Sequence, residues 1–145
     1  MHDGSVKIRR GKRTDFPALR ALLAPAEQAG ADKAQVRHWR RLARDPGHDF
    51  YIAEQEGTIR GMVLVGYVRE LRHYGWQAIL DMVMPSPAAC TIGQQLLDFA
   101  KARARKRGCQ HLLVWVTDQA RDERLPALAQ AGFRRVGEVL SYSLL

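Results

Sequence analysis

The sequence predicts a single α/β domain over residues 1–145, with a mixed, mostly antiparallel sheet flanked by helices. Two nearly continuous apolar stretches, residues 79–84 and 111–117, are typical of strands buried on both faces. Between them, residues 91–107 repeat apolar side chains at intervals of three and four, which indicates a helix. A buried strand, a helix and a second buried strand in succession predict a right-handed parallel crossover.

The N-terminal part of the chain predicts one strand and two helices. Residues 6–10 alternate apolar and basic side chains, as a half-buried strand does. Thr14 or Asp15 suits the N-cap of a first helix, and a second helix is expected over about residues 32–44. The second helix has a basic face, which we interpret as a solvated surface, with contact to an acidic substrate or a nucleic acid as the alternative. That face consists of Lys33, Arg37, Arg40, Arg41 and Arg44.

The centre and the end of the chain predict further strands. Residues 50–54 and 59–68 flank a turn in which Gly57 suits a tight hairpin, and Gly61 and Gly66 are candidate bulge positions. A second turn leads into the strand that ends at Met84. After residue 117 we expect a short helix and two final strands. Their ranges are 124–131 for the helix, and 133–136 and 139–144 for the strands.

Composition limits the classes of function. The chain has 145 residues, 46% hydrophobic and 26% charged, which suits one globular domain. No apolar run could span a bilayer and no secretory signal is evident, so a cytoplasmic location without a membrane partner is expected. Two cysteines without a second ligand pair predict no metal site. The formal net charge of +8 favours anionic partners. Because no stacking-aromatic pattern or helix-turn-helix accompanies the charge, nucleic acid is not the expected partner.

The order of elements resembles the GNAT superfamily of N-acetyltransferases over essentially the whole chain. The residues that carry the resemblance are 51–54 and 57–61 in the hairpin, 85–97 in the middle, and Ala131-Gly132-Phe133 near the end. The resemblance implies that acetyl-CoA is a co-substrate whose acetyl group passes to an amine of a small molecule or a peptide. It also implies that the pantetheine arm lies between the fourth and fifth strands, and that backbone NH groups before the third helix hold the pyrophosphate.

The pyrophosphate motif of that family, Arg/Gln-x-x-Gly-x-Gly/Ala, is degenerate in this chain. Spacing from Pro85 places Ala88, Thr91 and Gly93 on the three motif positions, and only the glycine is retained. Residues 91–94 also have the form of a capping box, in which Thr91 and Gln94 would occupy the helix's free donors and compete with phosphate. The resemblance assigns to acetyl-CoA the residues Val83, Met84, Ala88, Ala89, Cys90, Thr91, Ile92, Gly93 and Gln94.

The family's usual general acid is missing, because its tyrosine position falls on Leu128. Asp81 is the candidate general base. Burial of a carboxylate in an apolar strand favours its protonated form, and the raised pKa that results suits a group that accepts a proton. The alternative for Asp81 is a place at a sheet edge or an ion pair with an arginine. Tyr142, on the last predicted strand, is the candidate acid. Other candidates for acid or substrate contact are Tyr67, His73 and Tyr74, and Cys90 has no histidine at a spacing that would make it a nucleophile.

Two functions therefore stay open. The first is an acetyl-CoA-dependent N-acetyltransferase with an unidentified acceptor. The second is a catalytically impaired protein of the same fold that binds CoA or a partner as a sensor or interaction module; the missing tyrosine and the altered loop favour it. The apolar final strand also offers a sheet edge through which a homodimer could form.

Overall fold

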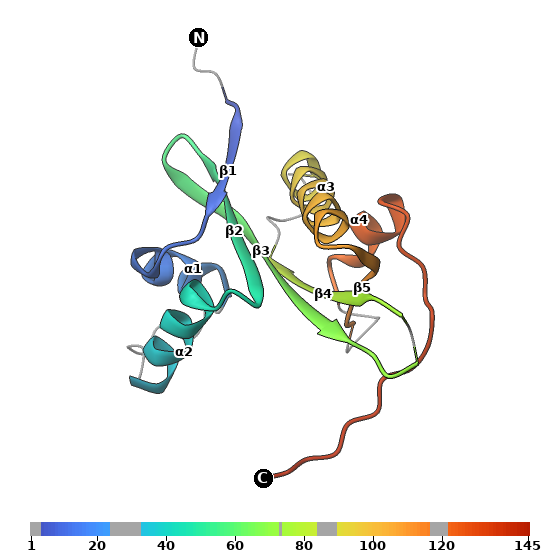
Figure 1. Ribbon diagram of the computed structural model, residues 1–145. Coiled ribbons are helices and arrows are strands. Elements are labelled where there is room, and N and C mark those ends of the chain that lie inside the picture. Colours follow the sequence, from blue (N-terminus) through green and yellow to red (C-terminus); the bar gives the residue numbers. More distant parts are fainter. Residues whose placement is uncertain (1–3, 24–32, 73, 84–89, 117–121) are drawn as a thin grey trace.

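The computed structural model describes residues 4–23, 33–72, 74–83, 90–116 and 122–145, which contain a five-stranded sheet of order β1-β2-β3-β4-β5 (Figure 1). The first four strands pair antiparallel with their neighbours, whereas β5 pairs parallel with β4. The predicted class, a mixed and mostly antiparallel sheet flanked by helices, is confirmed. The strands are β1 (Val6–Arg10), β2 (His48–Gln55), β3 (Thr58–Arg69), β4 (Trp76–Val83) and β5 (Cys109–Val114). The helices are η1 (Arg13–Asp15), α1 (Phe16–Leu23), α2 (Lys33–Arg44), α3 (Cys90–Lys106) and α4 (Leu125–Gln130).

Helices cover both faces of the sheet, with α1 and α2 on one side and α3 and α4 on the other (Figure 1). Because side chains alternate along a strand, Met62 and Val63 of β3 belong to different apolar clusters. The first cluster lies against α1 and contains Leu19, Phe50, Ile52 and Met62. The second is the main core against α3 and includes Val63, Val65, Leu80, Met82, Leu96, Leu97 and Ala100.

Both N-terminal helices form where the sequence predicts them. Trp39, from the apolar side of α2, packs its ring against Phe16 and Phe50 at centroid distances of 5.3 and 5.5 Å. The five basic residues of α2 are all exposed, as expected of a solvated face. The α2 helix therefore packs on the domain through the Trp39 ring.

The β2–β3 hairpin turns at Glu56 and Gly57, whose φ angles of 51° and 77° are left-handed, so the predicted glycine turn is confirmed. A register shift between Ala53 and Glu54 places a bulge beside Gly61, also as predicted. Gly66 is different, because it pairs in regular register with His48, and the expected bulge there is wrong.

The predicted crossover is formed by β4, α3 and β5. The face of α3 that contains Ile92, Leu96, Ala100 and Ala104 is buried against the sheet. Gly108 ends the helix with a φ of 77°, which a side chain would resist. Strand β4 starts three residues before the expected residue 79, and β5 runs from residue 109 to 114 rather than from 111 to 117.

The two final strands predicted from the sequence do not form. Residues 133–145 have no regular secondary structure. After α4, Gly132 adopts a φ of 93° and the Phe133 backbone NH donates to the Leu128 carbonyl at 3.0 Å. Every residue from Arg134 to Leu145 is exposed. An alternating pattern favours an extended chain, but a strand also needs a neighbour with which to exchange hydrogen bonds.

Within the described residues, no helix is long and apolar enough to cross a membrane.

Candidate functional site

The parallel strands β4 and β5 separate before β4 ends. Their pairing stops at Leu80 opposite Val114, although β4 continues for three more residues. Over those residues β4 stays bonded to β3, with Met82 opposite Val63 and Val83 opposite Met62. We call the place where the backbones of β4 and β5 no longer pair the β4–β5 gap.

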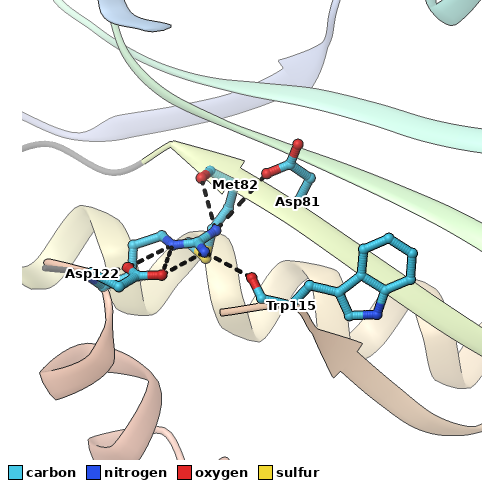
Figure 2. A network of polar contacts seen from close by, with 5 residues as sticks. Asp81, Met82, Trp115 and Asp122 are labelled. Atoms are coloured by element: carbon cyan, nitrogen blue, oxygen red, sulfur yellow. Dashed lines mark hydrogen bonds and ion pairs between the residues drawn. The ribbon is translucent and has the colours of Figure 1, made fainter. Parts of the chain in front are cut away.

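Arg124, just before α4, spans this gap with its guanidinium. Its Nη2 donates to the carbonyl oxygen of Trp115 at 3.1 Å, and its Nη1 reaches the carbonyl oxygen of Met82 at 3.5 Å (Figure 2). These carbonyls belong to the two sides of the gap. Because a guanidinium carries five NH donors in a fixed plane, it can bridge the two backbones where they no longer bond to each other.

Asp122 orients the Arg124 guanidinium. Arg124 donates from Nε to Oδ1 at 3.0 Å and from Nη2 to Oδ2 at 2.8 Å, a bidentate pair, and the Arg124 backbone NH donates to Oδ1 at 2.9 Å. The hydrogen bonds from Arg124 hold the pKa of Asp122 below its usual range, and the Asp122 carboxylate raises the pKa of Arg124. The gap therefore contains a guanidinium that stays protonated and is paired with the Asp122 carboxylate.

Asp81 lies at the same gap but is not buried. Its side chain is 77% exposed, and its Oδ1 lies 3.9 Å from Arg124 Nη1 (Figure 2). The ion pair with an arginine, which the sequence left open as the alternative, is what the structure shows. The burial on which the expectation of a tuned general base rested is absent.

The start of α3 differs from the expected capping box. The helix already includes Cys90, so Thr91 lies inside the first turn, where it is exposed, and is not the N-cap. The Gln94 side chain donates from Nε2 to the Ala127 carbonyl at 3.3 Å and so contacts α4 instead of the helix's own start. The expected competition between self-capping and an anion is therefore wrong. No acidic residue lies in the first turn.

The other residues assigned to acetyl-CoA have different places. Val83 ends β4 at the gap, while Ile92 and Gly93 are buried in the first turn of α3. Met84, Ala88 and Ala89 lie outside the described residues, and for Cys90 only the backbone is described.

The structure does not bring the two predicted catalytic side chains together. Tyr142 is 86% exposed on the C-terminal segment, whereas Asp81 lies on β4. Leu128, on the family's tyrosine position, is buried in the main core at 3% exposure. The Tyr67 hydroxyl donates to the buried carboxylate of Asp49. Its proton is therefore engaged in a structural contact.

Arg124 is the site residue that the sequence analysis missed. The sequence held one weak signal for Arg124. It lies four residues, or about one helical turn, before Leu128, which occupies the family's tyrosine position. Nothing in the sequence indicates, however, that the carbonyls of Met82 and Trp115 converge on it.

A second concave site lies between η1, α1 and α2, on the other side of the sheet. It is a pocket of about 190 Å³ in which two arginines flank two aromatic rings. Its lining consists of Arg13, Thr14, Phe16, Val36, Trp39 and Arg40. Among the residues with described positions, no three His, Cys, Asp or Glu side chains could together hold a metal ion.

A family model described as the acetyltransferase (GNAT) family matches residues 16–133. The chain therefore belongs to the GNAT acetyltransferases, as its sequence resemblance implied. No match to this sequence was found among curated proteins.

Solved structures with the same fold are numerous, and three illustrate their range. A transcriptional regulator from Bacillus halodurans C-125 is 26% identical with a TM-score of 0.82, and the match covers 97% of this chain and 100% of that one. Glucosamine-6-phosphate N-acetyltransferase from Arabidopsis thaliana is 16% identical, with a TM-score of 0.74 and coverages of 97% and 99%. An aminoglycoside N-acetyltransferase solved with CoA is 15% identical, with a TM-score of 0.77 and coverages of 96% and 94%.

Proposed function

We propose that this protein is an N-acyltransferase that moves the acetyl group of acetyl-CoA to the amine of a small molecule or a peptide. Membership of the GNAT family supports this function. The observation that carries it is the β4–β5 gap, where the Arg124 guanidinium, paired with Asp122, lies between two strands that have stopped pairing. In this proposal the thioester of acetyl-CoA binds in that gap.

The start of α3 suits the pyrophosphate of acetyl-CoA. A helix of 17 residues presents free NH groups and the positive end of its dipole at its N-terminus. No carboxylate in the first turn of α3 repels an anion. We therefore keep as proposed contacts the residues Val83, Met84, Ala88, Ala89, Cys90, Thr91, Ile92, Gly93 and Gln94.

The proposed reaction is direct attack of the amine nitrogen on the thioester carbonyl. A C–N bond forms, the C–S bond breaks, and the electron pair leaves on the CoA sulfur as a thiolate. Arg124 stabilises that negative charge, in place of the proton that a tyrosine would give. We propose that Asp81, exposed at the gap, accepts the amine's proton directly or through water. A role for Tyr142 as an acid requires the C-terminal segment to pack beside β5.

The positive charge on the surface of η1 and α2 suggests the class of acceptor. The exposed basic face of α2 and the Arg13 and Arg40 side chains of the neighbouring pocket favour an amine that also carries an acidic group. The aminoglycoside and glucosamine-6-phosphate enzymes of the same fold act on small amines, which supports a small-molecule acceptor as one choice.

A second candidate is binding of CoA without turnover. The observation that favours it is Leu128, buried where the family's acid is expected, together with a gap that Arg124 already bridges. In this alternative the protein acts as a sensor or interaction module.

One experiment separates the two functions. The purified protein is incubated with acetyl-CoA and a panel of amines, including acidic amino acids, acidic peptides, amino sugars and polyamines, and release of the CoA thiol is measured. The transferase predicts turnover above that of the heat-denatured protein with at least one amine. Binding of acetyl-CoA without thiol release would support the sensor, and absence of binding would exclude the transferase and the CoA sensor and leave only a module that binds a partner.

A further inference from the structure

The turn between β3 and β4 exposes large apolar side chains at the rim of the domain (Figure 1). Leu71 is 103% exposed and Tyr74 is 96% exposed. At the base of the turn, Val68 of β3 and Trp76 of β4 are 39% and 36% exposed. These side chains form an apolar tip, and no part of the described chain covers it. A group of large apolar side chains left in this state marks a surface that contacts something else.

Basic side chains border this apolar tip. Arg69 ends β3, Arg72 follows in the turn, and both are exposed. Lys106, the exposed last residue of α3, comes just before Cys109, which pairs with Trp76 at the base of the same hairpin. None of these three cations forms an ion pair with another described residue. Their charges are therefore available to an anionic partner.

The base of the hairpin holds the tip away from the sheet. The Arg69 guanidinium lies over the Trp76 ring, 4.4 Å from its centroid. Gly75 adopts a φ of 119°, a conformation that a side chain would resist. Gln110 of β5 donates from Nε2 to the Tyr74 carbonyl at 2.9 Å and so ties the turn to the neighbouring strand. The exposure of the tip is therefore built into the hairpin.

We propose that the β3–β4 turn binds the surface of a membrane that contains anionic lipids. Leu71 and Tyr74 enter the headgroup layer, while Arg69, Arg72 and Lys106 lie beside the lipid phosphates. Aromatic and aliphatic side chains bordered by cations suit this interface, because it offers apolar surface and negative charge at the same depth. The formal net charge of +8 attracts the whole domain to such a surface. This inference stands independently of the proposed transferase activity.

The chemistry of the tip favours lipid over a nucleic acid. Single-stranded nucleic acid binds by stacking its bases on open aromatic faces, but Arg69 already covers one face of Trp76. Leu71 has no aromatic face, whereas a lipid interface accepts an aliphatic side chain as readily as an aromatic one. The sequence predicted no membrane partner because no apolar run could span a bilayer. That argument does not apply to a turn that lies on the bilayer surface.

Flotation of the full chain with phospholipid vesicles tests the contact. At about 0.15 M salt the wild-type protein should float with vesicles of equal parts phosphatidylcholine and phosphatidylserine, and not with phosphatidylcholine alone. Leu71→Asn with Tyr74→Asn should lower the bound fraction at least about fivefold. The matched control, Leu140→Asn with Tyr142→Asn, removes the same residue types from the exposed C-terminal segment and should bind as the wild type does. Circular dichroism establishes that both variants are folded.

A second pair of variants separates a local contact from net charge. Arg72→Gln with Lys106→Gln should lower vesicle binding far more than Lys33→Gln with Arg37→Gln, which removes the same charge from the first turns of α2. Equal losses in these two variants, a wild-type protein that floats with neither kind of vesicle, or full binding by the apolar double variant of the turn would each overturn the proposal. Binding of a single-stranded oligonucleotide without binding of vesicles would also overturn it and assign the turn to a nucleic acid.

Discussion

Arg103 donates two hydrogen bonds to Asp49, from Nε to Oδ2 and from Nη2 to Oδ1, both at 3.2 Å, and so ties the C-terminal part of α3 to β2. Asp49 is 1% exposed, and Tyr67 and Arg107 also donate to it. A buried carboxylate with three donors is stabilising only while it stays charged and paired. This network therefore joins β2 to α3, and both elements contribute residues to the main core.

We expect Asp49→Asn to destabilise the protein by about 2–3 kcal/mol, because Arg103, whose side chain is only 22% exposed, loses its counter-charge. Urea denaturation monitored by circular dichroism measures the change. Arg107→Gln is the matched control. Its side chain is 41% exposed, so we expect a loss below about 1 kcal/mol. Equal losses in the two variants would contradict a network centred on Asp49.

The same network predicts a pH dependence of stability. Burial alone would raise the pKa of Asp49, but hydrogen bonds from Arg103 and Tyr67 outweigh it and hold the pKa below its usual range. A carboxyl group with a depressed pKa in the folded state contributes its full stability above the unfolded-state pKa of about 4 and loses it as pH falls further. Melting temperature should therefore decline below about pH 5, and Asp49→Asn should flatten that decline. A decline equally steep in the variant would assign it to other carboxylates.

A steric prediction concerns Gly11, which follows β1. A Cβ there would lie 2.0 Å from Cε1 of Phe50, a ring that is 4% exposed and packed on Trp39. Because that ring has little room to move, Gly11→Ala should cost about 2 kcal/mol of stability in urea denaturation. Gly137→Ala is the control, since nothing lies within 4 Å of its Cβ position, and its effect should stay within about 0.5 kcal/mol. Tolerance of Gly11→Ala would show that Phe50 is not confined as the structure places it.

A functional prediction concerns Arg124. If its charge stabilises the departing thiolate, Arg124→Gln should lower kcat by about 100-fold while the KM for acetyl-CoA changes little. Arg124→Lys keeps the charge but loses the bidentate pair with Asp122, so we expect partial activity. The control is Arg105→Gln on the exposed side of α3, which should retain full activity with the same loss of charge. A higher KM at unchanged kcat would assign Arg124 to binding alone.

The crossover and the hairpin were predictable because their signals are local. Apolar runs defined β4 and β5, the three-and-four spacing defined α3, and Gly57 and Gly108 occupy the left-handed positions that end or turn an element. The exposure of Asp81 was not predicted, because its run was read as buried on both faces. In the structure Leu80 and Met82 are buried and Asp81 faces the other way.

The remaining discrepancies depend on long-range contacts. The alternating pattern of residues 139–144 predicted a strand, and the strand does not form because the segment pairs with no strand of the described residues. The Thr91 capping box failed because the helix starts at Cys90 and Gln94 finds an acceptor on α4. Arg124 takes its place from Asp122 and from two main-chain carbonyls, and side-chain identity does not encode which carbonyls converge there.

Calorimetric titration with acetyl-CoA tests the central claim, that the start of α3 and the β4–β5 gap bind this co-substrate. The wild-type protein is compared with Thr91→Glu, which puts a negative charge in the first turn of α3, and with the control Gln95→Glu, four residues further along the same helix. Both positions are exposed, so neither variant should unfold.

We predict micromolar binding by the wild-type protein and a loss of at least about tenfold in Thr91→Glu, because like charges repel at short range. Binding by Gln95→Glu should stay close to wild type. No heat of binding by the wild-type protein at millimolar acetyl-CoA, or equal affinity in all three proteins, would contradict the proposed site.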